Sequence, residues 1–130
     1  MKFYGYDSVP QEVRDIYERL LKCWCPGTCA ASMREDWSPD NPSLGQCSIS
    51  SFLVQDELGG EVYGIPLPGG GVHCFNKVNG VVFDLTSAQF GGKELDYSNC
   101  APQSRETHFA DPDKLRRYTL LKELYRDVVR

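Results

Sequence analysis

The chain has 130 residues, of which 41% are hydrophobic and 25% are charged, and its formal net charge is −4. These proportions are typical of a folded protein and exclude a disordered chain, and the length predicts a single domain, 1–130, with its own core. The acidic balance and the scattered basic residues exclude a nucleic-acid partner. No apolar run approaches the roughly 18 residues that span a bilayer, and the N-terminus lacks the apolar segment of a signal peptide. We therefore expect a cytoplasmic protein, away from membranes, whose six cysteines are mainly reduced.

The N-terminal part predicts one helix and a long irregular segment. Residues 8–24 place apolar side chains three or four positions apart, with Ser8 as the cap and Pro10 in the first turn. Residues 25–45 contain repeated proline and glycine and are expected to be irregular.

A second helix is expected over residues 46–58, ended by Gly59 and Gly60. The pattern then changes to that of strands, over 61–67, 72–78 and 81–86. Pro66 indicates that the first of these lies at a sheet edge, and Asn79-Gly80 is the turn of a tight hairpin between the other two.

The C-terminal part predicts a short helical turn over 87–92, a loop or weak strand over 93–110, and a long helix over 111–129. Asp111 would cap this last helix, and Leu115, Tyr118 and Leu121 belong to its apolar stripe. The order of elements predicts an α+β fold, with helices packed on a small antiparallel sheet and closed by a C-terminal helix.

The hairpin turn fixes which side chains share a face. A two-residue turn at Asn79-Gly80 pairs Val78 with Val81, so that His73 and Asp84 point to the same side as diagonal neighbours. Diagonal Cα atoms lie roughly 7–8 Å apart, within reach of an imidazole–carboxylate hydrogen bond.

Cys47 is the candidate nucleophile. It stands at the predicted start of a helix, where the helix dipole favours a thiolate, and a nearby imidazolium would add to this effect. The order Cys47, His73, Asp84 is compatible with a catalytic triad if the fold brings the first two together.

Three segments carry a resemblance to known proteins: WSPDNPSLGQCSISSFLVQDELGG, HCFNKVNGVVFDLTSAQF and RRYTLLKELY. The chain resembles the YunG-like family, small bacterial proteins with no assigned activity. A cysteine at a helix start, a histidine on a following strand and an acid on the next strand also resemble the papain-like superfamily, including its NlpC/P60 and transglutaminase-like groups.

The resemblance implies a papain-like domain and a cysteine hydrolase or acyltransferase that acts on an amide, ester, thioester or peptide, without a cofactor. It implies Cys47 as nucleophile, His73 as general base and Asp84 as the residue that orients it. The backbone N–H of Cys47, helped by the Gln46 side chain, would bind the oxyanion. The alternative is a non-catalytic binding module on the same scaffold, suggested by the small domain and by Ser48 where papain-like enzymes often have an aromatic residue.

Other polar residues have structural interpretations. Cys23, Cys25 and Cys29 lack the C-x₂-C spacing of zinc sites, so we expect no metal there. His108 is expected at the surface, and the small basic cluster of Lys114, Arg116 and Arg117 is expected on a solvated helix face.

Overall fold

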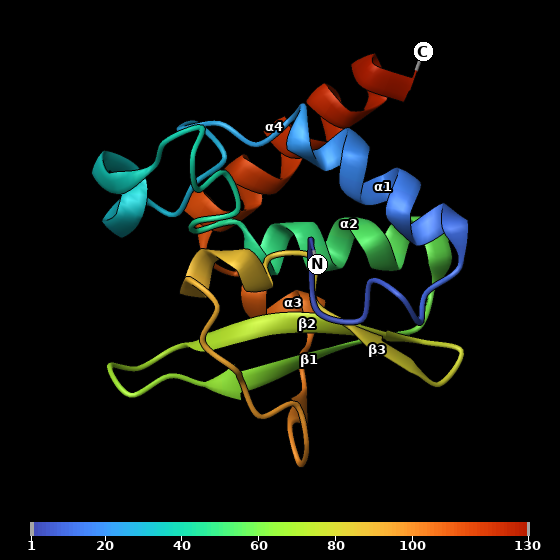
Figure 1. Ribbon diagram of the computed structural model, residues 1–130. Coiled ribbons are helices and arrows are strands. Elements are labelled where there is room, and N and C mark those ends of the chain that lie inside the picture. The colour runs from blue at the N-terminus through green and yellow to red at the C-terminus, as the bar shows by residue number, and fades with distance from the viewer. Residues whose placement is uncertain (1, 130) are drawn as a thin grey trace.

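The computed structural model describes residues 2–129 and has an α+β architecture, with a small antiparallel sheet below and helices above it (Figure 1). Helix α2 lies directly over the sheet, and α1 and α4 cover α2 from the other side. No helix within residues 2–129 is long and apolar enough to cross a membrane. The helices and strands are α1 Gln11–Leu21, α2 Cys47–Leu58, β1 Glu61–Pro66, β2 Val72–Val78, β3 Val81–Phe83, β4 Ala101–Pro102, α3 Arg105–Phe109 and α4 Pro112–Val129.

Helix α1 is shorter than its apolar pattern predicts. It begins after Pro10, which occupies the cap position without a side-chain hydrogen bond, so the expected cap at Ser8 is wrong. The predicted apolar face is confirmed, and Trp24 follows the helix into the core, where its indole N–H donates to Ser50 Oγ at 2.8 Å. Within the irregular segment, residues 31–36 form one 3₁₀ helix.

The sheet has the strand order β3-β2-β1-β4. The hairpin register is confirmed, with Val78 opposite Val81 and Asn76 opposite Phe83. Strand β1 is not an edge strand, because β4 pairs with it at Tyr63 and Gly64. Pro66 is tolerated there because the short β4 does not extend to it.

Helix α2 is buried on nearly every side over its first two turns, rather than along one stripe. Residues 48–54 are all buried, since β2 lies below them and α4 above. Asn76, on the helix-facing side of β2, donates from Nδ2 to the Ser51 carbonyl at 2.9 Å and so ties the helix to the strand.

The segment after β3 differs most from the expectation. Strand β3 ends at Phe83, and Asp84 instead forms a bridge with Tyr4, donating its N–H to the Tyr4 carbonyl at 3.1 Å. The short helical turn is confirmed as a 3₁₀ helix over residues 87–90. Within 93–110 the weak strand is confirmed as β4, but helix α3 was not expected.

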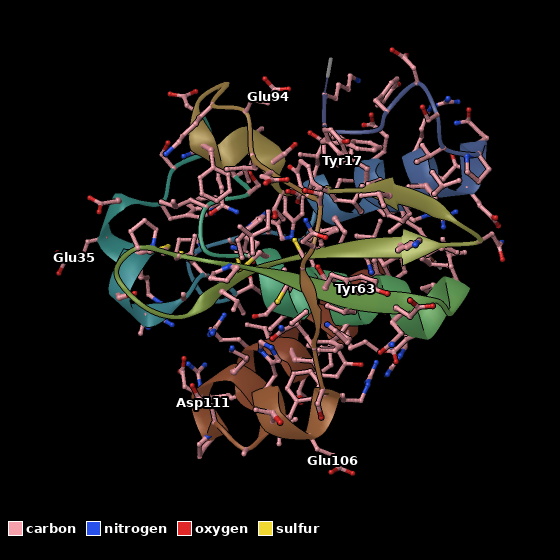
Figure 2. All side chains as sticks on the ribbon, turned by 90° about the horizontal axis from the view of Figure 1, so that it is seen from below. Tyr17, Glu35, Tyr63, Glu94, Glu106 and Asp111 are labelled. Carbon is pink, nitrogen blue, oxygen red and sulfur yellow. The ribbon has the colours of Figure 1, made fainter. Side chains whose placement is uncertain are left out.

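The predicted cap of helix α4 is confirmed, because Asp111 Oδ1 accepts the backbone N–H groups of Asp113 and Lys114. Its inner face is shifted from the predicted stripe, because Leu115 is 44% exposed whereas Arg117 is only 4% exposed. The prediction that Arg117 lies on a solvated face is therefore wrong. Figure 2 shows the molecule from below, with Tyr63 in front of the sheet and Asp111 at the margin formed by α3 and the start of α4.

Candidate active site

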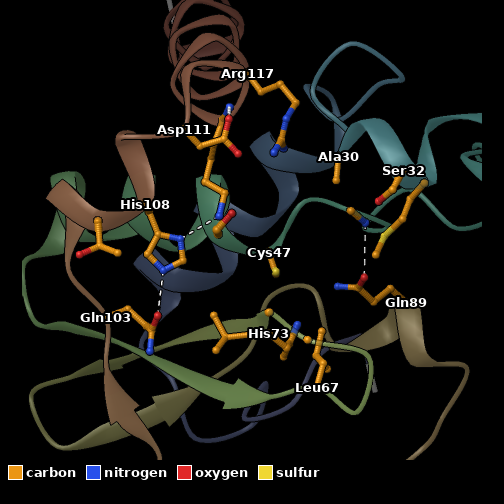
Figure 3. Close-up of a pocket in the computed structure, with 18 of the residues that line it drawn as sticks. Ala30, Ser32, Cys47, Leu67, His73, Gln89, Gln103, His108, Asp111 and Arg117 are labelled. Atoms are coloured by element: carbon orange, nitrogen blue, oxygen red, sulfur yellow. Dashed lines mark hydrogen bonds between the residues drawn. The ribbon is translucent and has the colours of Figure 1, made fainter.

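A cleft of about 560 Å³ opens where the start of α2 meets the start of β2. Cys47 and His73 both line it. In the close-up, Cys47 lies at the centre above His73, with His108 and Gln103 on one side and Gln89 on the other (Figure 3). The structure thus brings together two of the three residues of the predicted triad in one cavity.

Cys47 is the first residue of α2 and its side chain is half-buried. Gly45, two residues before Cys47, has a φ of +71°, a left-handed conformation that lets the chain turn sharply into the helix. A Cβ at this position would lie 2.6 Å from the Cys29 sulfur, so only glycine fits without displacement. The local sequence therefore fixes the nucleophile candidate at a helix N-terminus, where the helix dipole favours a negative charge.

His73 and Asp84 form the predicted hydrogen bond. His73 Nε2 lies 2.6 Å from Asp84 Oδ2, and both side chains are 1% exposed. Because Nε2 is bound to the carboxylate, Nδ1 is the ring nitrogen left to face the thiol of Cys47. The Phe90 ring packs edge-on against the imidazole, with the ring centroids 4.7 Å apart, and holds its plane.

Asp84 is itself held by three further donors. Thr86 donates its backbone N–H at 3.1 Å and its hydroxyl at 3.3 Å to Oδ1, and the Tyr97 hydroxyl donates to Oδ2 at 2.7 Å. The sequence pattern gave no indication of Tyr97, which lies in the segment without periodicity. Its ring stacks on Tyr4 with a centroid distance of 4.0 Å, and the Asp84 side chain is only 1% exposed.

The electrostatics of this group favour a thiolate–imidazolium pair at neutral pH. Hydrogen bonding by Cys74, and then the hydrogen bond and charge of His73, hold the pKa of the Cys47 thiol well below its usual range, although burial opposes them. Burial would lower the pKa of His73, but hydrogen bonds to Asp84 and Cys47 raise it to about 10. Cys47 can therefore carry a negative charge where an isolated cysteine is protonated.

Gln46 does not occupy the expected position. Its side chain is fully buried and does not line the cleft, and Nε2 donates to the Cys25 carbonyl at 3.3 Å. The amide group is directed into the loop beneath the helix start, so the expected contribution of this side chain to an oxyanion site has no geometric support. The backbone N–H of Cys47, at the helix N-terminus, remains the candidate donor.

A second polar group lines the cleft beside the nucleophile candidate. His108 Nε2 lies 2.8 Å from Gln103 Oε1, and Nδ1 lies 2.9 Å from Lys114 Nζ. His108 is 8% exposed, so its predicted surface position is wrong, and Lys114 is half-buried rather than solvated. The sequence analysis missed this site; Ser104, a residue type that caps helices, could have indicated it, since its hydroxyl accepts the Thr107 N–H at the start of α3.

The three N-terminal cysteines lie between α1 and α2 and differ in burial. Cys23 and Cys29 are buried and Cys25 is half-buried, and all three are free. Burial raises the pKa of Cys23 to about 11, which disfavours the thiolate that a metal would need. Across the part of the chain that the structure describes, no group of three or more His, Cys, Asp or Glu side chains is arranged to hold a metal ion.

Comparison with known proteins identifies the family. The family model described as YunG protein matches residues 12–130, and the chain belongs to this family. A similar protein is "Uncharacterized protein YunG" of Bacillus subtilis (strain 168), which is 35% identical over 89 residues, covering 68% of this chain and 74% of the relative. No solved structure matches the chain.

Proposed function

We propose that this YunG family member is a papain-like cysteine hydrolase or acyltransferase, in which Cys47 is the nucleophile, His73 the acid–base and Asp84 the residue that orients the imidazole. The observation that carries the proposal is the buried 2.6 Å hydrogen bond between Asp84 and His73, because His73 lines the same cleft as Cys47. A cysteine at a helix start, a strand histidine and an acid that fixes the histidine tautomer are the parts that thiol-dependent acyl transfer requires.

The chemistry follows from the charge state of the pair. The Cys47 thiolate attacks the carbonyl carbon of an amide, ester or thioester, and a carbon–sulfur bond forms. The His73 imidazolium donates its proton to the leaving amine, alcohol or thiol as the tetrahedral intermediate collapses. Water or an amine then attacks the thioester, His73 takes up the proton, and the carbon–sulfur bond breaks to release the product.

Alkylation by iodoacetamide between pH 5 and 9, read by mass spectrometry at each cysteine, tests the nucleophile. Cys47 should react fastest below pH 7, because its pKa is lowered by Cys74 and His73. Cys100 is the internal control, since it is half-buried and burial raises the pKa of its thiol.

His73→Ala should slow the reaction of Cys47 at pH 6 at least tenfold, because a loss of more than about one pH unit in thiol acidity reduces the thiolate fraction by that factor. Equal rates for Cys47 and Cys100 in the unmodified protein would favour the binding module without turnover. A panel of p-nitrophenyl esters and peptide amides, compared between the protein and Cys47→Ser, then separates a reactive thiol from a catalyst.

A further inference from the structure

The wall of the cleft beside Cys47 carries an ammonium group with an uncharged partner. Lys114 Nζ lies 2.9 Å from Nδ1 of His108. An ammonium can only donate, so Nδ1 must accept, and the ring proton must lie on Nε2, which donates to Gln103 Oε1. Burial, and then the charge of Lys114, lower the pKa of His108, so the imidazole is neutral at pH 7.

This arrangement leaves the charge of Lys114 available to the cleft. Among residues 2–129 Lys114 takes part in no ion pair. Asp111, an acidic residue that also lines the cleft, accepts the backbone N–H groups that begin α4. His108 takes one of the three N–H donors of the ammonium, and two remain for a ligand.

Arg117 lines the same cleft but has structural partners. It donates from Nε to Asp113 at 2.9 Å and from Nη1 to the Thr28 carbonyl at 3.2 Å, which ties α4 to the loop before α2. Its charge is offset by Asp113, whereas the charge of Lys114 faces a neutral ring.

Lys114 is linked through His108 to the residues around the thiol. His108 Nε2 lies 4.0 Å from the Cys74 sulfur, and Cys47 packs against the cluster that contains Cys74. Cys47, His108 and Lys114 all line one cavity. A substrate whose carbonyl lies at Cys47 would therefore place a neighbouring substituent beside this wall.

We propose that Lys114 binds a carboxylate or phosphate group of the acyl compound that reacts at Cys47, and that His108 and Gln103 are positioning residues for it. The proposal rests on the function proposed for Cys47 and names the substrate class as anionic. A lysine ammonium recognises such groups as a point charge, and the partly enclosed cleft weakens the screening by water.

Two alkylating agents that differ in charge test the proposal in the full chain at low ionic strength. The ratio of the rates of iodoacetate and iodoacetamide at Cys47 should fall about threefold to tenfold in Lys114→Gln, the effect expected of one charge at short range. Lys114→Arg should keep most of the ratio. Lys93→Gln, which removes the same charge from an exposed loop, should leave it unchanged. An unchanged ratio in Lys114→Gln would overturn the proposal.

A measurement without the nucleophile separates this proposal from the function of Cys47. Cys47→Ser is titrated with succinate and with inorganic phosphate, and the ring resonances of His108 are followed by NMR. A saturable shift that is lost in Cys47→Ser/Lys114→Gln supports the anion site even if Cys47 proves unreactive. Rapid alkylation of Cys47 together with no saturable shift by either anion refutes the anion site and leaves the nucleophile in place.

Discussion

Replacement of Asp84 by asparagine tests the central electrostatic argument while nearly preserving the shape of the side chain. Oδ1 can still accept the two hydrogen bonds from Thr86, but an amide nitrogen takes the position of Oδ2, 2.6 Å from His73 Nε2 and 2.7 Å from the Tyr97 hydroxyl. The imidazolium therefore loses its charged acceptor. A hydrogen bond to a charged group contributes about 1.5–3 kcal/mol, and one pKa unit corresponds to about 1.4 kcal/mol.

The expected result is a fall of about one to two pH units in the pKa of His73 from its value of about 10, with a rise in the pKa of Cys47. Both pKa values can be measured in one titration between pH 4.5 and 10. The rate of iodoacetamide alkylation at Cys47 gives the pKa of the thiol, and the ¹⁵N shifts of His73 give the pKa of the imidazole. The ¹⁵N shifts also report the tautomer, which should change to Nδ1–H as Nε2 becomes an acceptor.

Tyr97→Phe is the matched control for Asp84→Asn. It removes a hydrogen bond to the same Oδ2 atom but keeps the carboxylate charge, so the pKa of His73 should not fall. Urea unfolding of both variants shows that the fold is retained, at an expected cost of about 1–3 kcal/mol in the free energy of unfolding. If Asp84→Asn leaves the pH profiles of Cys47 and His73 where they were, the carboxylate does not set the charge state of the site.

Two further predictions concern the approach to the helix and the pH dependence of stability. Gly45→Ala should lower the free energy of unfolding by about 2–4 kcal/mol, because a Cβ there meets the Cys29 sulfur at 2.6 Å in a left-handed backbone conformation, whereas Gly69→Ala, where nothing lies within 4 Å, should cost little in urea unfolding. Between pH 6.5 and 9.0, the usual pKa values of histidine and cysteine, folding transfers a proton from Cys47 to His73 with no net uptake, so the stability that the pair contributes is flat. Below pH 6.5 the unfolded chain binds one proton more than the folded chain, so the contribution decreases as the pH is lowered. Above pH 9.0 the unfolded chain binds one proton fewer, so the contribution decreases as the pH rises through about 10. The free energy of unfolding relative to Cys47→Ser/His73→Gln should therefore be largest between these limits, and a monotonic difference from pH 5.5 to 10 would contradict the ion pair.

The features that sequence predicts well here depend on local rules. The Asn79-Gly80 turn sets the hairpin register, and the register puts His73 and Asp84 on one face, so their hydrogen bond could be derived from a few consecutive residues. The strand itself ends earlier than its apolar pattern, because the Asp84 N–H pairs with Tyr4 from the N-terminal segment rather than with β2. The sequence of residues 81–86 alone cannot indicate that Tyr4 pairs with Asp84.

The sequence could not predict the position of residues that belong to segments without hydrophobic periodicity. Tyr97 and Gln103 lie in a stretch without a hydrophobic period, and His108 is buried only because α3 folds back beside β1 and β2. Long-range contacts explain the outcomes at Gln46 and Arg117. Gln46 was expected to help bind the oxyanion and Arg117 to lie on a solvated face, but both side chains donate to carbonyl groups of the loop before α2.

Cys47 approaches β2 through the packing of α2 on this strand, which includes apolar contacts and one buried polar contact. Asn76 Nδ2 donates to the backbone carbonyl of Ser51, so these two residues of β2 and α2 lie side by side. Four residues back along the helix cover about 6 Å, and two residues back along the strand cover about 6.6 Å, which brings Cys47 level with Cys74 and beside His73. Because α2 and β2 run in the same direction, their first residues meet at the cleft. A sequence shows that Asn76 is polar on an apolar face, but only the packing of α2 shows that it donates to the Ser51 carbonyl.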